Sequence, residues 1–152
     1  MKKLKWDESL NAAGNARVIL PRMAVAYFEH GRKLAQDPPS ASELHGFRLD
    51  TKALRYTLEL FRPCYGPGLE RRLAVLRKIQ TYLGEINDYA TTIQLVAARL
   101  PEDDAERPRI QRLLEARARR KTAEFRRYAR QLFRDAGEER RWSAYLSRPR
   151  RG

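Results

Sequence analysis

The sequence predicts an all-α protein, an antiparallel helical bundle with about five main helices. Three observations lead to this fold class. Helix-forming residues dominate the chain, and the alternation of apolar and polar residues that marks strands is weak. The 8 glycines and 8 prolines fall mostly between the periodic segments, where helix breakers belong. The segments between the predicted helices are short, which makes consecutive helices antiparallel.

The first predicted helix covers residues 11–36. Its apolar residues recur at helical spacing, and a pair of prolines follows it. Pro21 lies inside the periodic segment. Because proline lacks a backbone N–H and clashes with the preceding turn, it predicts either a kink there or a later start of the helix.

The second predicted helix begins after Ser40 or Ser42, either of which is a natural N-cap, and extends to about residue 61. Glu43 follows Ser40 by three residues, which is the spacing of a capping box. This helix carries the strongest functional signal in the chain.

The remaining helices are bounded by glycine or proline. We predict a third helix over 69–83 with Gly84 as its C′ residue, a fourth over 86–100 ended by Pro101, a fifth over 104–135 ended near Gly137, and one or two further turns around Trp142 and Leu146. We expect residues 1–146 to form a single helical domain and the basic segment 147–152 to be a disordered tail.

The charge of the chain favours a polyanionic partner. Of its 152 residues, 32 are Lys or Arg and 19 are Asp or Glu, which gives a formal net charge of +13. The basic residues comprise 25 arginines and 7 lysines. Because the guanidinium group is planar and donates two parallel hydrogen bonds, arginine suits phosphate oxygens. Nucleic acid, polyphosphate and an anionic membrane surface are the partner classes that this composition favours.

Composition also argues against several other classes. A single cysteine excludes a disulfide framework and any cysteine-based zinc site, and the two histidines are far apart in the sequence. No apolar run is long enough to span a membrane, and the basic N-terminus is not followed by an apolar stretch. We therefore expect a cytoplasmic protein with no membrane partner, no metal and no cofactor.

A polar stripe lies along one side of the second helix. Its members recur at spacings of three and four residues and fall within an arc of about 80° at 100° per residue: His45, Arg48, Lys52, Arg55 and Glu59. A neighbouring arc of about 100° carries the apolar residues Leu44, Phe47, Leu54, Leu58 and Phe61. One helix therefore presents a core stripe with cations beside it.

This stripe has two interpretations. Charged stripes are usually solvated helix faces, and like charges three or four residues apart cost a few tenths of a kcal/mol each. The alternative is an anion site, and His45 favours it because a solvated face does not need an imidazole in line with guanidinium groups. Glu59 offsets only one of the cations.

The same residues resemble the CHAD family, named for a conserved histidine and an α-helical domain. The resemblance is carried by the His45 stripe with Tyr56 beside it and, downstream, by Leu76-x-x-Ile79-Gln80-x-x-Leu83-Gly84-x-x-Asn87-Asp88. It covers about residues 43–95 and implies a CHAD-like helical bundle whose basic surface binds inorganic polyphosphate. Polyphosphate granules would then be a further expected location.

Residue by residue, the resemblance assigns the anion-binding face to His45, Arg48, Lys52 and Arg55. Lys78, Arg22 and Arg32 are candidates to flank it, with Lys78 preferred over the adjacent Arg77. The arginines of the fifth predicted helix are either a wider electrostatic surface or a solvated face. The matching residues Gln80, Gly84, Asn87 and Asp88 also have ordinary structural roles at helix ends.

The chain departs from the family in one respect. Family members resemble two helical halves, each with its own basic stripe, and this chain has one stripe, like a short single-half member. A two-fold symmetric homodimer would restore the second face, because the symmetry axis repeats the same patch. We carry that homodimer as a hypothesis.

The expected function is non-catalytic binding of inorganic polyphosphate through the basic helical face. The alternative is a nucleic-acid-binding protein of low sequence specificity, with nucleic acid as a secondary polyanion. No aromatic residues for base stacking are clearly interleaved with the stripe, and no helix-turn-helix or zinc-finger pattern is present. An enzyme is disfavoured because the chain lacks a Gly-x-x-x-x-Gly-Lys loop and a convincing carboxylate cluster for Mg²⁺.

Overall fold

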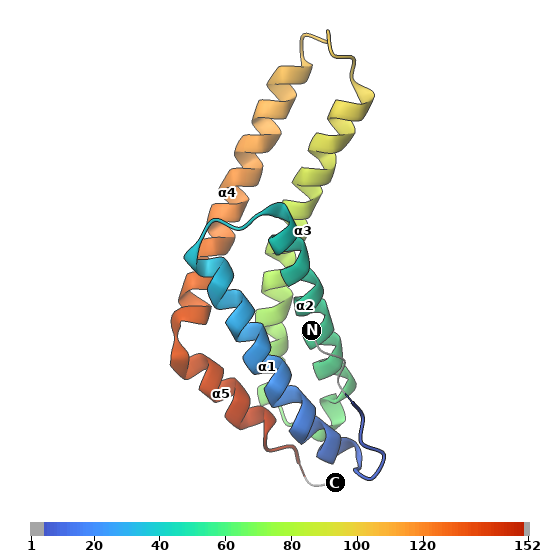
Figure 1. Cartoon of the computed structure of the whole chain (residues 1–152), viewed down its shortest axis with the longest axis vertical. Coiled ribbons are helices and arrows are strands. Elements are labelled where there is room, and N and C mark those ends of the chain that lie inside the picture. Colours follow the sequence, from blue (N-terminus) through green and yellow to red (C-terminus); the bar gives the residue numbers. More distant parts are fainter. Residues whose placement is uncertain (1–4, 151–152) are drawn as a thin grey trace.

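The computed structural model describes residues 5–150 and consists of helices, which confirms the predicted all-α bundle (Figure 1). Its α-helices are α1 (Ala12–Gln36), α2 (Ala41–Leu60), α3 (Gly68–Arg99), α4 (Arg107–Arg134) and α5 (Ala136–Leu146), with a short 3₁₀ helix, η1, at Arg62–Cys64. The described residues thus form five α-helices, as expected in number, but the third and fourth predicted helices are one.

Four long helices form an antiparallel square. Sequence neighbours pack against each other from α1 to α4, and α4 closes the square against α1. Helices α2 and α4 occupy opposite corners, and the Phe47 and Phe125 rings approach across the core with centroids 6.3 Å apart. Helix α5 packs on the outside of α1. Beyond the ends of α1 and α2, α3 and α4 continue as a projecting hairpin (Figure 1).

Helix α1 begins well before its proline. Asn11 caps it, and the Asn11 side chain accepts a hydrogen bond of 2.8 Å from the backbone N–H of Gly14. Pro21 lies inside the helix. The prediction of a later start is therefore wrong, because apolar residues on both sides of Pro21 are buried in one core: Ala16, Leu20, Met23, Ala24 and Tyr27.

Helix α3 runs through Gly84, so the predicted break at that residue is wrong. Among the described residues no glycine has a positive φ, and Gly84 has ordinary helical backbone. Ile79, Leu83 and Ile86 are buried on both sides of the glycine. Glycine costs a helix only about 1 kcal/mol. Burial of these three side chains more than offsets that cost.

An aromatic core fixes α2 against α1 and α4. The Tyr27 and Phe47 rings stack with centroids 4.8 Å apart, and the Phe133 ring meets both edge-on at 5.7 Å. The buried Tyr27 hydroxyl hydrogen-bonds the Thr51 hydroxyl at 3.0 Å, so neither buried polar group lacks a partner. This packing sets the rotation of α2 about its axis, and therefore the direction in which the His45 stripe faces.

Helix α5 is longer than the one or two turns expected. It spans eleven residues and buries Trp142 and Leu146 against the bundle. The Tyr65 hydroxyl donates a 2.7 Å hydrogen bond to the Leu146 carbonyl, which ties the end of α5 to the segment after η1. In the tail, the Arg150 N–H donates to the Cys64 carbonyl at 2.7 Å, and residues 151–152 lie outside the described part.

Across residues 5–150, none of the helices is both long and apolar enough to cross a membrane.

Candidate functional site

The His45 stripe begins one turn after a well-capped helix start. Ser40 and Glu43 form the expected capping box: the Ser40 hydroxyl accepts from the Glu43 N–H at 3.2 Å, and the Glu43 carboxylate accepts from the Ser40 N–H at 2.7 Å. That second bond lowers the pKa of the Glu43 carboxyl. The capping box therefore stabilises the N-terminal end of α2, where the first two turns carry His45 and Arg48.

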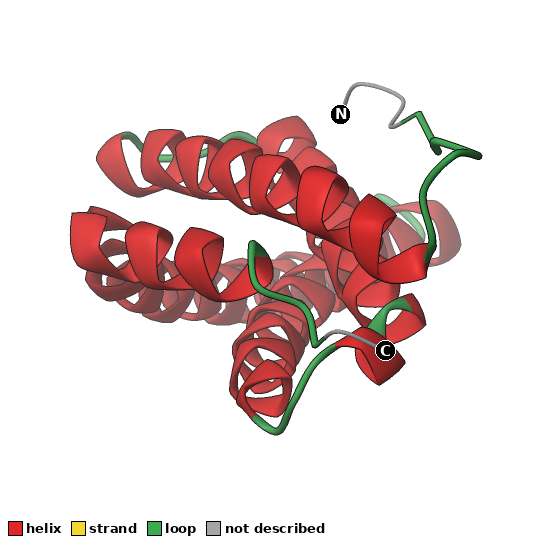
Figure 2. Ribbon diagram, turned by 90° about the horizontal axis from the view of Figure 1, so that it is seen from below, coloured by secondary structure: helices red, strands yellow, loops and turns green. Residues whose placement is uncertain are grey.

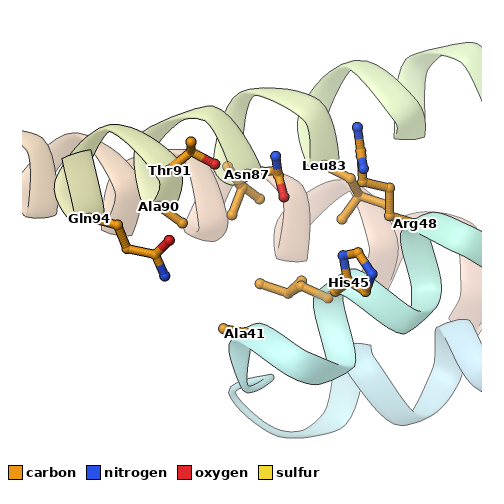
Figure 3. A pocket seen from close by; sticks show the side chains of 10 residues that line it. Ala41, His45, Arg48, Leu83, Asn87, Ala90, Thr91 and Gln94 are labelled. Atoms are coloured by element: carbon orange, nitrogen blue, oxygen red, sulfur yellow. The ribbon is translucent and has the colours of Figure 1, made fainter.

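His45 and Arg48 line a pocket between α2 and α3. The pocket holds about 230 Å³. Figure 3 shows Asn87, Thr91 and Gln94 following one another along α3 opposite His45. The apolar part of the lining comes from Ala41, Leu44, Leu83, Ile86 and Ala90. An imidazole, a guanidinium, two amides and a hydroxyl thus surround one hollow, which is a donor set suited to an anion.

Arg48 and Lys52, near the middle of α2, have no acidic partner among the described residues. Arg48 and Lys52 are half-buried beside the core of α2. Across residues 5–150, no carboxylate oxygen lies within 4.0 Å of the charged nitrogens of either one, since all recorded ion pairs join other residues. The charges at these two positions are therefore not offset by a neighbouring carboxylate within the described residues.

The C-terminal end of the stripe, at Arg55, is neutralised by carboxylates. Arg55 Nη1 lies 3.4 Å from Glu59 Oε1, and Arg77 Nη2 of α3 lies 3.6 Å from the same oxygen. Arg77 also approaches Glu70 at 3.7 Å, and Glu70 pairs with Arg62 at 3.0 Å. Three arginines and two glutamates thus form a chain of ion pairs. Arg55 sits on the stripe as predicted, but its charge is shared with Glu59.

Lys78 faces α4 and not the stripe. Its Nζ lies 4.4 Å from the centroid of the Tyr128 ring, a cation–π arrangement on the α3–α4 side. The adjacent Arg77 is the residue that reaches α2. Successive helical residues point about 100° apart, so only one of the two side chains reaches a given neighbour. The rotation of α3 about its axis therefore points Arg77, and not Lys78, toward α2.

Arg22 and Arg32 lie on the α5 side of α1, away from α2. Arg32 forms an ion pair with Glu139 of α5. Arg22 borders a shallow hollow that Ser143 of α5 also lines. The structure therefore brings together His45 and Arg48 with Lys52 and Arg55 along α2, and does not bring Lys78, Arg22 or Arg32 to them.

Sequence reasoning missed Thr91 and Gln94. They follow Asn87 by four and seven residues, so they share its side of α3. That spacing was visible in the sequence, but its relation to His45 depends on how α3 packs against α2. Asn87 was given a structural role at a helix end, whereas it lies inside α3 and lines the pocket.

The other histidine has a packing role. His30 Nδ1 lies 2.8 Å from Asp50 Oδ2, a contact that joins α1 to the side of α2 opposite the stripe. Within the described part of the chain, no group of three or more His, Cys, Asp or Glu side chains is arranged to hold a metal ion.

Comparison with known proteins gives one match. The model of the CHAD domain family matches residues 2–97, which include α1, α2 and nearly all of α3. No curated protein and no solved structure matches the chain. Helices α4 and α5 lie outside the matched segment.

Proposed function

Since the chain belongs to the CHAD domain family, we propose that it binds inorganic polyphosphate and that it does so without catalysis. The proposed site is the α2/α3 face, which we define as His45, Arg48 and Lys52 of α2 with Asn87, Thr91 and Gln94 of α3. The observation that carries the proposal is the pocket between these helices, where His45 and Arg48 have no carboxylate partner among the described residues.

The chemistry of binding is electrostatic. The helical rise of 1.5 Å per residue spaces His45, Arg48 and Lys52 about 4.5 and 6 Å apart along the axis of α2, so a linear phosphate chain lying along the helix can contact them in turn. Arg48 donates two parallel hydrogen bonds to phosphate oxygens, and Lys52 acts as a compact point charge. Each neutralised phosphate releases counterions, which drives binding at low salt.

Binding alone accounts for the groups around the pocket. They are N–H and O–H donors over an apolar floor, which is what holding an anion requires. Because α2 is capped and packed against α3, the donors are held in place before a ligand arrives. Less ordering entropy is then lost on binding.

Low-specificity nucleic-acid binding is the second candidate, and one residue favours it. Tyr56 lies beside the stripe, 53% exposed, with the Arg55 guanidinium 4.6 Å from its ring centroid. An exposed ring next to a cation can stack a nucleobase, a contact worth about 1–3 kcal/mol per base. Tyr56→Ala should therefore weaken single-stranded DNA binding if this function holds, and leave polyphosphate binding unchanged.

The deciding experiment is a titration of the protein with polyphosphate, single-stranded DNA and duplex DNA over a range of salt concentrations. We expect polyphosphate to bind most tightly per phosphate. Arg48→Gln with Lys52→Gln should weaken it about tenfold and lower the salt slope by about two. A matched control, Arg71→Gln with Arg140→Gln, removes the same charge from exposed positions elsewhere.

Two outcomes would contradict the proposal. Equal affinity for all three polyanions would mean that the net charge attracts phosphate chains in general. Equal losses in the α2 variant and the charge-matched control would mean that the α2/α3 face has no special part in binding. Circular dichroism of each variant separates loss of binding from loss of the fold.

The proposed homodimer is a separate question with a separate measurement. A two-fold dimer would present two α2/α3 faces to one polyphosphate chain. Sedimentation at micromolar concentration should then give twice the monomer mass. A monomer that binds polyphosphate with undiminished affinity would contradict the dimer and leave the site in place.

A further inference from the structure

The most basic element of the protein is α4, which lies outside the family match. Its 28 residues include ten arginines, one lysine and two glutamates. Helix α2, which carries the proposed site, has three basic and three acidic residues, with His45 in addition. Most of the net charge of +13 therefore resides on a helix to which the family comparison assigns nothing.

The arginines of α4 include a row along its outer side. Arg112, Arg119 and Arg126 are seven residues apart, so they lie on one side of the helix about 10 Å from one another. Arg130 extends the row by one turn. Phe125, Ala129 and Phe133 are buried in the core on the adjoining side of the helix, about 85° from the row at 100° per residue. We call the row Arg112, Arg119, Arg126 and Arg130 the α4 face.

The arginines of this row form no ion pair with a carboxylate of residues 5–150. The recorded ion pairs of α4 belong to residues outside the row: Arg109 with Glu106, Arg120 with Glu124, and Lys121 with Glu85 and Glu124. Over residues 5–150, no carboxylate lies within 4.0 Å of the guanidinium groups of the row. The Nε of Arg126 is buried without a hydrogen-bond partner. The fold thus leaves a line of positive charge uncompensated, which favours an external anion.

The α4 face points away from the α2/α3 face. Arg130 Nε donates to the carbonyl of Ala35, near the C-terminal end of α1, at 3.2 Å. The row therefore lies on the α1 side of α4, and from Arg130 it continues toward the projecting α3–α4 hairpin (Figure 1). The His45 stripe lies along the edge of α2 that adjoins α3. In the four-helix square, the α1–α4 edge and the α2–α3 edge are opposite edges. Figure 2 shows the helical bundle from below.

We propose that the α4 face is a second polyanion-binding surface, and that the protein thereby links two polyphosphate segments. The proposal rests on the function proposed above for the α2/α3 face. Two faces on opposite sides cannot both engage one short chain, but they can engage two long ones. A bivalent protein and a multivalent chain then build a network, which dissolves when excess chain occupies each face separately.

The test uses the full-length protein and polyphosphate of two lengths, about ten and several hundred phosphates. Light scattering measures assembly, and isothermal titration measures affinity for the short chain. Arg112→Gln, Arg119→Gln and Arg126→Gln together define the α4 variant, since glutamine preserves helix propensity. The control removes three exposed, unpaired charges elsewhere: Arg17→Gln, Arg71→Gln and Arg140→Gln.

The expected result separates the two faces. The wild-type protein and the control should scatter light with the long chain at intermediate ratios and clear again in excess. The α4 variant should lose this scattering and lower the salt slope for the long chain by about three. The affinity of its tighter site for the short chain should stay within about twofold of the value for the control variant, because the α2/α3 face is unchanged.

Other results would overturn one proposal or the other. If the α4 variant scatters as the control does, the second surface is wrong whatever happens at α2. If Arg48→Gln with Lys52→Gln leaves short-chain binding intact while the α4 variant abolishes it, the proposed α2 site is wrong and the α4 face stands as the binding surface. Circular dichroism confirms that each variant is folded.

Discussion

The two basic faces of this protein differ in how their charge is balanced. On α2 the cations are few, and Arg55 is paired with Glu59, which also pairs with Arg77 of α3. On α4 the row is longer and has no carboxylate within 4.0 Å in the described chain. A short stripe that borders a pocket and is neutralised only at Arg55 suits the selective placement of one phosphate segment that we propose. A long open row suits binding that weakens strongly with salt and does not select among polyanions. The contrast teaches that net charge alone does not locate the selective site.

The largest expected effect comes from two glycines, one packed against α4 and one on α2. A Cβ added to Gly31 of α1 would lie 2.6 Å from the Phe133 ring of α4, whereas one added to Gly46 of α2 would meet nothing within 4 Å. Gly31→Ala should destabilise the protein by about 1–3 kcal/mol through overpacking. Gly46→Ala should stabilise it by up to about 1 kcal/mol. Urea unfolding measures both, and a stable Gly31→Ala would contradict the tight α1–α4 contact.

The next effect concerns the helix starts. Ser40 caps α2 with its side chain, whereas Glu106 at the start of α4 makes no side-chain cap. Ser40→Ala should cost about 1 kcal/mol of stability and weaken short-chain polyphosphate binding, because the turn before His45 frays. Glu106→Ala should change stability by less than about 0.5 kcal/mol. Equal losses from the two substitutions, measured by thermal unfolding, would mean that α2 does not depend on its cap.

A smaller effect concerns the shared carboxylate of the α2 side. Glu59→Gln releases Arg55 and Arg77 from their common partner. Polyphosphate affinity should rise about two- to threefold at low salt and return to the wild-type value at high salt, because exposed charges are screened. Glu102→Gln, between α3 and α4, is the matched control, since Glu102 is exposed and forms no ion pair within the described residues. An unchanged affinity for Glu59→Gln would mean that Arg55 takes no part in binding.

The smallest effect is a pH dependence at the helix caps. The Ser40 N–H lowers the pKa of the Glu43 carboxyl, and the Arg141 side chain lowers the pKa of Asp135 at the start of α5. A depressed native pKa stabilises the fold above the unfolded value of about 4 and ceases to do so as pH falls through the native value. The stability difference between wild type and Glu43→Gln should therefore shrink from pH 6 to pH 3. A difference that is constant with pH would exclude this linkage.

Much of the α2/α3 face could be predicted from the sequence. The positions of His45, Arg48, Lys52 and Arg55 on one side of α2 follow from 3.6 residues per turn, and the capping box at Ser40 from a three-residue spacing. Both are properties within one helix, so no tertiary information is needed. The CHAD resemblance, carried by the same residues, is confirmed by the family match.

Relations between helices could not be predicted in the same way. The choice between Lys78 and Arg77 requires the rotation of α3 about its own axis. Neighbouring helical residues point about 100° apart, and sequence periodicity does not determine the rotation that closely. The predicted break at Gly84 relied on local propensity, which the buried side chains on both sides override. Thr91 and Gln94 were passed over because nothing local to α3 shows what lies opposite.

The sequence by itself determined the all-α class, the two stripes of α2 and the concentration of arginine on α4, since composition and helical periodicity are properties of the chain alone. Only the tertiary structure decided that Asn87 faces the His45 pocket, that Glu59 joins Arg55 to Arg77, and that the two basic faces lie on opposite edges of the square. Those outcomes depend on how each helix is rotated against its neighbours. The packing of Tyr27, Phe47 and Phe133 fixes the rotation of α1, α2 and α4, and the contact of Tyr82 with Phe125 joins α3 to the same core.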